Sequence, residues 1–200
     1  MLRRAALCGV AAAGALGLGV AGVARGGEDE HGSGAAVAQL RDSTGKRIGT
    51  VRFLARPGGS LRVRVDVSGL TPGFHGFHVH ATGQCVAPFT SAGGHHDAAG
   101  QSHGAHAGDL PPLLVLRDGT ASTRFQTDAL TLKQLLDARA DGSALIVHAG
   151  RDNLANIPPH YHSHVPDDTS TTFGPNAVTL ATDDAGARAA CGVVTGSRDQ

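Results

Sequence analysis

The stretch LRVRVDV, from Leu61 to Val67, gives the clearest indication of the fold class of this protein. Apolar and charged side chains alternate along it without interruption. Because successive side chains of a β-strand point to opposite faces of a sheet, a period of two predicts a half-buried antiparallel strand. Its core-facing residues are expected to be Leu61, Val63, Val65 and Val67.

Further strand signals surround this stretch at short intervals. Upstream, residues 35–42 and 47–56 read as two strands joined by the turn STGK. Downstream, the expected strands are 74–80, two within 112–127 around the turn RDGT, 143–150 and 190–194. About eight short strands with little helix favour an all-β sandwich or barrel.

One short helix is expected over residues 131–138, where Thr131 and Gln134 have the spacing of a capping box. Two long segments lack any periodicity, namely 81–110 and 149–187. Compact domains seldom leave loops of that length without a function. These two loops are therefore expected to contribute to the function.

Composition restricts the classes of protein to which the chain can belong. It has 200 residues, of which 40% are hydrophobic and 17% are charged, as in a folded single domain. Seventeen basic and 17 acidic residues balance, so nothing predicts a nucleic-acid partner.

The N-terminus is typical of an export signal, with the basic start MLRR followed by a run of small apolar residues. We expect a signal peptide over residues 1–24, a flexible lead-in over 25–34 and one domain over 35–200. The alternative is a retained membrane anchor, since the run is long enough to span a bilayer. With cleavage, no stable membrane association is expected, and the location is extracytoplasmic: secreted, periplasmic or in the cell envelope.

Removal of the signal peptide would remove Cys8 and leave two cysteines, Cys85 and Cys191. In the oxidising environment of exported proteins, two such cysteines usually form a disulfide. Two free thiols are the alternative.

Histidine is the abnormal component, with 12 residues in the chain. Three of them fall in the motif GFHGFHVH, from Gly73 to His80. On an extended strand His78 and His80 point to the same side and could chelate a metal ion. His75 points the other way and is expected to bond to the backbone as a structural histidine.

Other metal-ligand residues lie at strand ends or in glycine-rich bends, as His95 and His148 do. The segment HGAHAGD adds His103, His106 and Asp109. Sets of histidine with aspartate suit zinc and copper.

With these motifs the chain resembles the copper/zinc superoxide dismutases, specifically the exported bacterial kind. The matching stretches are GFHGFHVH, SAGGH, HAGDL, LIVHAGRDN and DAGARAACGVV, and they occur in the order that the family has. The resemblance extends from about Ala35 to Thr195. It implies an eight-stranded antiparallel Greek-key β-barrel with two long functional loops.

The resemblance also implies roles for individual residues. Copper would be bound by His78, His80, His95 and His148, and zinc by His95, His103, His106 and Asp109. His95 would bridge the two metals and carry a proton in catalysis. Asp152 would tie a copper-ligand histidine to a zinc-ligand histidine, and Arg188 would attract the anionic substrate. Cys85 and Cys191 match the family disulfide.

The function so implied is the conversion of superoxide to dioxygen and hydrogen peroxide by alternating Cu(II) and Cu(I). A copper carrier or storage protein on the same fold is the alternative, but it would need neither Arg188 nor a bridging His95. The expected partner is superoxide, and both a monomer and a homodimer stay open.

The chain departs from the family pattern at two places. His103 and His106 are only three residues apart, a shorter zinc loop than many members have, and His96 stands where an aromatic residue is common, which makes it a candidate stand-in ligand. The segment PPHYHSH, with His160, His162 and His164 in alternation, has no family counterpart. It is either a solvated loop or an additional copper site, and the former is favoured because short motifs often mislead.

Overall fold

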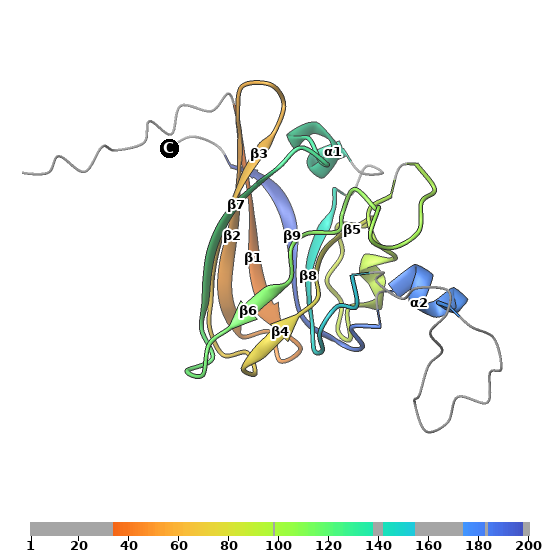
Figure 1. Ribbon diagram of the computed structural model, residues 1–200. Helices are drawn as coiled ribbons and strands as arrows, with labels where there is room; N and C mark the ends of the chain where they lie inside the picture. Colours follow the sequence, from red (N-terminus) through yellow and green to blue (C-terminus); the bar gives the residue numbers. More distant parts are fainter. Residues whose placement is uncertain (1–33, 98, 138–141, 155–173, 183, 198–200) are drawn as a thin grey trace, which may run out of the picture.

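The computed structural model describes residues 34–97, 99–137, 142–154, 174–182 and 184–197. Within these ranges the chain forms a curled antiparallel sheet with two short helices beside it (Figure 1). The strands are β1 (Ala35–Asp42), β2 (Arg47–Ala55), β3 (Leu61–Val67), β4 (Gly73–His75), β5 (Phe77–His80), β6 (Leu113–Val115), β7 (Ala121–Thr127), β8 (Ala144–His148) and β9 (Arg188–Ser197).

Seven strands pair in the order β5-β8-β9-β1-β2-β3-β7, and β4 pairs with β6 in a second, two-stranded sheet. The predicted antiparallel Greek-key barrel is confirmed, with nine strands in the described part of the chain instead of eight. The additional strand arises at Gly76, which divides the single strand expected over 74–80. Its N–H donates to Gly150 O (2.9 Å), and its carbonyl accepts from His148 N (2.8 Å).

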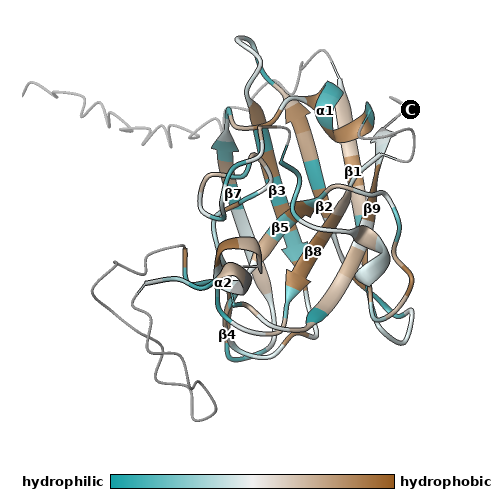
Figure 2. Cartoon of the chain, turned by 90° about the vertical axis from the view of Figure 1, so that its right-hand side faces the viewer, coloured by the Kyte–Doolittle hydropathy of each residue, from teal (hydrophilic) through white to brown (hydrophobic). Residues whose placement is uncertain are grey.

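The core contains the residues of β3 that the alternating pattern predicted to be buried. Leu61, Val63 and Val65 are fully buried and Val67 nearly so, as the period of two predicted. They pack in one cluster with the inward residues of the neighbouring strands, including Phe53 on β2. Strand β8 is buried along its whole length and is hydrophobic almost to its end (Figure 2), which is typical of a strand covered on both faces.

The helix expected after β7 is present as α1 (Leu132–Asp137), and its capping box is confirmed. Thr131 N donates to Gln134 Oε1 (2.8 Å), and Gln134 N donates to Thr131 Oγ1 (3.3 Å). The second long loop contains α2 (Ala177–Thr182), which the sequence did not predict, and the first contains a short 3-10 turn, η1 (Thr90–Ala92). Among the described residues, no helix is long and apolar enough to cross a membrane.

The first long loop folds back onto the free edge of β5. Val79 N donates to Gly108 O (2.9 Å), and Val79 O accepts from His96 N (2.8 Å). A Cβ on Gly108 would lie 2.3 Å from Val79 O, so only glycine permits this close approach. The loop thereby places its histidines beside those of β5.

Candidate metal centre

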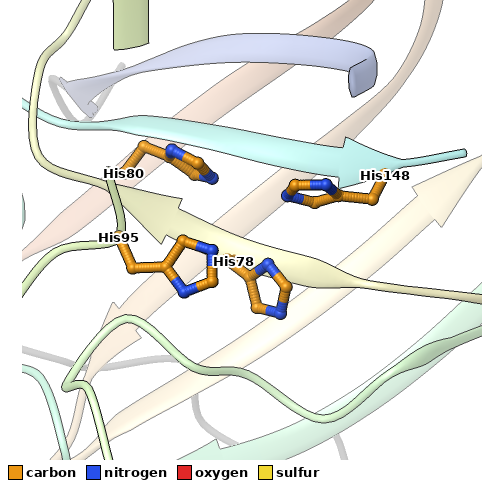
Figure 3. A group of neighbouring side chains, drawn as sticks. All are labelled: His78, His80, His95 and His148. Atoms are coloured by element: carbon orange, nitrogen blue, oxygen red, sulfur yellow. The ribbon is translucent and has the colours of Figure 1, made fainter. Parts of the chain in front are cut away.

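Four histidines from three separate segments form one cluster, in which their rings converge (Figure 3). His78 and His80 come from β5, His148 from the end of the adjacent β8, and His95 from the first long loop. One ring nitrogen of each lies within 4.8 Å of one nitrogen of every other. This is the set that the sequence assigned to copper.

Strand pairing explains how these residues meet. Strands β5 and β8 are antiparallel neighbours, in which His78 pairs with Ile146, two residues before His148, and His80 pairs with Ala144 at the start of β8. His80 also forms an isolated β-bridge with His95. Phe77 and Val79 point into the core, which leaves His78 and His80 on the opposite side of β5, as their spacing predicted.

The buried polar atoms of this centre fit a metal ion. His80 Nδ1 donates to Gly93 O (2.9 Å), whereas its Nε2 is buried and has no hydrogen-bond partner among the described residues. The same holds for Nδ1 of His103, whose Nε2 bonds to Asp152. Buried polar groups are nearly always satisfied, so these two nitrogen atoms indicate ligand positions.

A second cluster of possible ligands, namely His78, His95, His103 and Asp109, overlaps the first in His78 and His95, and His106 lies beside it. Asp109 Oδ1 is 2.9 Å from His95 Nδ1, 3.3 Å from His103 Nδ1 and 3.4 Å from His106 Nδ1. His95 Nδ1 and His106 Nδ1 are 3.2 Å apart. A tetrahedral zinc site with ligand distances of about 2.0–2.1 Å has ligand–ligand separations of about 3.3–3.4 Å. The distances from Asp109 Oδ1 to His103 Nδ1 and His106 Nδ1, and from His95 Nδ1 to His106 Nδ1, are close to this value.

The short spacing of His103 and His106 does not disturb this arrangement, because the loop turns tightly around Asp109. Ala105 N donates to Ser102 O (3.1 Å). The second carboxylate oxygen of Asp109 accepts from Gly104 N (2.7 Å) and His106 N (3.0 Å). His96 is buried, but it belongs to neither cluster found among the described residues.

Asp152 connects the two clusters. His78 Nε2 donates to Asp152 Oδ2 (2.7 Å), and His103 Nε2 donates to Asp152 Oδ1 (2.9 Å). The carboxylate side chain is almost completely buried. Each bond fixes the tautomer of its histidine and turns the other ring nitrogen toward a cluster.

The protonation equilibria reflect these contacts. Burial lowers the pKa of His80 well below 6.5, which favours the neutral imidazole that binds metals. Burial also opposes protonation of His103, but its contacts with the carboxylates of Asp109 and Asp152 outweigh this effect and raise the pKa to about 10. Burial would raise the pKa of both carboxyl groups, yet their histidine partners hold it below the ordinary value. Asp109 and Asp152 are therefore ionised at the second cluster, and a divalent cation bound there would replace the proton on His103.

Arg188, at the start of β9, lies beside the first cluster. Its Nη2 donates to Gly93 O (2.6 Å), which is also the acceptor of His80 Nδ1 (2.9 Å). Its Nη1 donates to Phe89 O (2.5 Å). Gly93 has φ 74° and ψ −157°, a conformation that only glycine adopts readily, so this shared acceptor depends on glycine.

Two further predictions are confirmed. His75 is buried away from both clusters, with Nδ1 2.6 Å from His148 O and Nε2 2.7 Å from Thr71 O, as expected of a structural histidine. Cys85 and Cys191 form a disulfide. The histidines at 160, 162 and 164 and the expected signal peptide lie outside the described residues.

The contacts that the sequence did not reveal are made by the main chain. Gly186 O is 3.1 Å from His148 Nδ1, and Leu180 O in α2 accepts from His103 N (2.9 Å). Phe89 O and Gly93 O hold Arg188. Carbonyl groups occur at every residue, so no side-chain pattern could have identified them.

The chain is thus a β-barrel protein with two overlapping histidine-rich clusters of possible metal ligands. The model of the copper/zinc superoxide dismutase family matches residues 47–194. The chain belongs to this family.

Similar proteins agree with this assignment. The chain is 40% identical to a "Superoxide dismutase [Cu-Zn]" of Mycobacterium tuberculosis, over 84% of this chain and 74% of the relative. It is 36% identical to an "Extracellular superoxide dismutase [Cu-Zn]" of Onchocerca volvulus, over 82% and 78%. A solved structure described as the clock protein EA4 has a TM-score of 0.64 and 25% identity, covering 80% of this chain and 93% of that one.

Replacing Asp152 by Asn tests how the two clusters are connected. The amide would present an NH2 group to one of two imidazole N–H groups, so one histidine would lose its orientation. We expect the affinity for the metal of that cluster to fall by about 10–100-fold, measured by competition with a chelator. Asp128→Asn, an exposed site after β7, is the matched control and should bind both metals normally. Equal affinities in the two variants would contradict the connecting role.

Proposed function

We propose that His78, His80, His95 and His148 bind copper, that His95, His103, His106 and Asp109 bind zinc, and that Arg188 attracts superoxide to the copper side. The activity is the dismutation of superoxide to dioxygen and hydrogen peroxide. The observation that carries this proposal is the shared His95, because its Nδ1 lies in the second cluster while its ring also belongs to the first. An imidazole has two ring nitrogens, so one histidine can serve both metals.

When bound, copper supplies the Cu(II)/Cu(I) couple that alternately oxidises and reduces superoxide, and zinc supplies a fixed charge without redox chemistry. His95 can hold and release a proton at Nε2, because its Nδ1 lies among the zinc ligands. Dismutation consumes protons to form hydrogen peroxide, so a proton carrier beside the copper is required. Asp152 keeps His78 and His103 oriented during turnover.

Arg188 attracts and orients the substrate. Its guanidinium stays charged at any physiological pH, and superoxide is an anion. Two carbonyl acceptors hold the guanidinium in place. The group is therefore already oriented when a superoxide anion arrives. Fixed charges of this kind raise the association rate of charged substrates, and superoxide dismutases are themselves a well-known example of such steering.

We also propose that the protein works outside the cytoplasm. The Cys85–Cys191 disulfide supports this, since such bonds persist in oxidising compartments, and one relative is named as extracellular. The N-terminal signal peptide would direct the export.

The test is metal analysis of purified protein combined with a superoxide assay on wild type and Arg188→Ala. Arg188→Ala should retain copper and zinc but lose activity by roughly tenfold, and its rate should depend less on ionic strength. Arg52→Ala, which removes an exposed positive charge from β2, is the control and should keep the wild-type rate. Copper binding without dismutation in the wild type would favour the carrier function.

A further inference from the structure

Phe89 has an aromatic side chain that the proposed function does not use, although its carbonyl contacts the substrate-attracting arginine. Its carbonyl accepts from Arg188 Nη1 (2.5 Å) across 99 positions of sequence, and its side chain is 3% exposed. We propose that Phe89 is a positioning residue, whose buried ring holds its carbonyl against Arg188 and so sets how strongly the copper side attracts anions. The proposal rests on the proposed function of Arg188.

The backbone at Phe89 is unusual for a bulky residue. Its φ of 72° and ψ of 13° lie in the left-handed region, which non-glycine residues seldom occupy. The conformation is held from both sides, because Phe89 N donates to Val86 O (2.6 Å) and Phe89 O accepts from Ala92 N (3.2 Å). The carbonyl of Phe89 therefore accepts one hydrogen bond from the η1 turn and one from the guanidinium of Arg188.

Backbone preference by itself would select glycine at this position, so the phenylalanine points to a role for the side chain. The ring belongs to a small apolar cluster that is separate from the main core. The other buried members of this cluster are Ala92, Ala144, Ile146 and Cys191, with Cys85 at its border.

This cluster connects the loop to the strands that carry the site. Ala144 and Ile146 belong to β8, which ends in His148, and Cys191 belongs to β9, which begins with Arg188. The ring thus fixes the carbonyl relative to both strands. Without the ring, Arg188 would keep its bond to Gly93 O but lose a fixed acceptor at Nη1.

The probe is azide, a small anion that binds copper, titrated into the copper- and zinc-loaded protein and followed by visible absorption. Phe89→Leu should weaken azide binding roughly threefold to tenfold while copper content stays at the wild-type level. Phe53→Leu makes the same change at a fully buried phenylalanine of the main core. It should lower thermal stability to a similar extent and leave azide affinity unchanged.

Phe89→Gly separates the backbone from the side chain, because glycine adopts φ 72° without strain but has no ring. It should weaken azide binding at least as much as Phe89→Leu does. Because glycine relieves the strain of the positive φ, Phe89→Gly also serves as the second variant if Phe89→Leu folds poorly. Wild-type azide affinity in a folded Phe89→Gly or Phe89→Leu protein would overturn the proposal.

A double variant shows whether the effect passes through Arg188. If it does, adding Phe89→Leu to Arg188→Ala causes no further loss of azide affinity, whereas independent effects would add. Additive losses would overturn the positioning role while leaving the function of Arg188 intact. Unchanged azide affinity in Arg188→Ala itself would instead refute the proposed function of the arginine, and the two failures are therefore distinguishable.

Discussion

His148→Ala is expected to abolish dismutation and to reduce copper content while the barrel stays folded. His148 is the only member of the four-histidine cluster that β8 contributes, and it is 4% exposed. Its removal leaves three imidazoles and opens the cluster to water. Activity should fall at least a hundredfold, which corresponds to roughly 2.7 kcal/mol in the barrier. The measurements are copper per chain, the superoxide assay and far-ultraviolet circular dichroism.

The matched control for this variant is His96→Ala. His96 is another buried histidine, but it lies outside both clusters of the described residues. The control should retain copper, zinc and activity, which would also exclude His96 as a stand-in zinc ligand. A His148→Ala protein with full activity would refute the assignment of the copper ligands.

Loss of the Cys85–Cys191 disulfide should have the largest effect on stability. The bond closes a loop with a sequence separation of 106 residues. In the chain-entropy model, a loop of this length restricts the unfolded chain enough to contribute about 4–5 kcal/mol to the free energy of unfolding. A Cys85→Ser, Cys191→Ser double variant should lose about that amount.

The measurement is denaturant unfolding of metal-free protein, so that metal affinity does not contribute to the difference. Wild type treated with a reductant is the control and should match the double variant. Mass spectrometry of the exported protein should find no free thiol at Cys85 or Cys191. Equal unfolding midpoints for the oxidised wild type and the double variant would contradict the prediction.

The parts of the molecule predicted from sequence are those that local geometry decides. A period of two fixed which residues of β3 face the core and which side of β5 carries His78 and His80, because side chains alternate along any strand. The capping box of Thr131 and Gln134 was likewise visible, since its partners are three residues apart. The number of cysteines, rather than their spacing, predicted the disulfide.

The family resemblance added the long-range groupings, which periodicity could not supply. Nothing in the local pattern joins His148 to His78, because their strands are distant in sequence and adjacent only in the sheet. The resemblance also gave no account of the short zinc loop. The structure shows that Asp109 compensates, since one carboxylate oxygen reaches the three histidine nitrogens and the other fixes the turn.

The β-class of the fold, the residues that face the core and the ligand chemistry of the histidines could all be inferred before folding, because each depends on side-chain identity and local backbone period. The division of one expected strand at Gly76, the presence of α2 and the fixing of Arg188 by Phe89 O and Gly93 O emerge only in the folded chain. These features depend on main-chain hydrogen bonds between distant segments. Every residue offers a carbonyl group, so its role is set by where the folded chain places it.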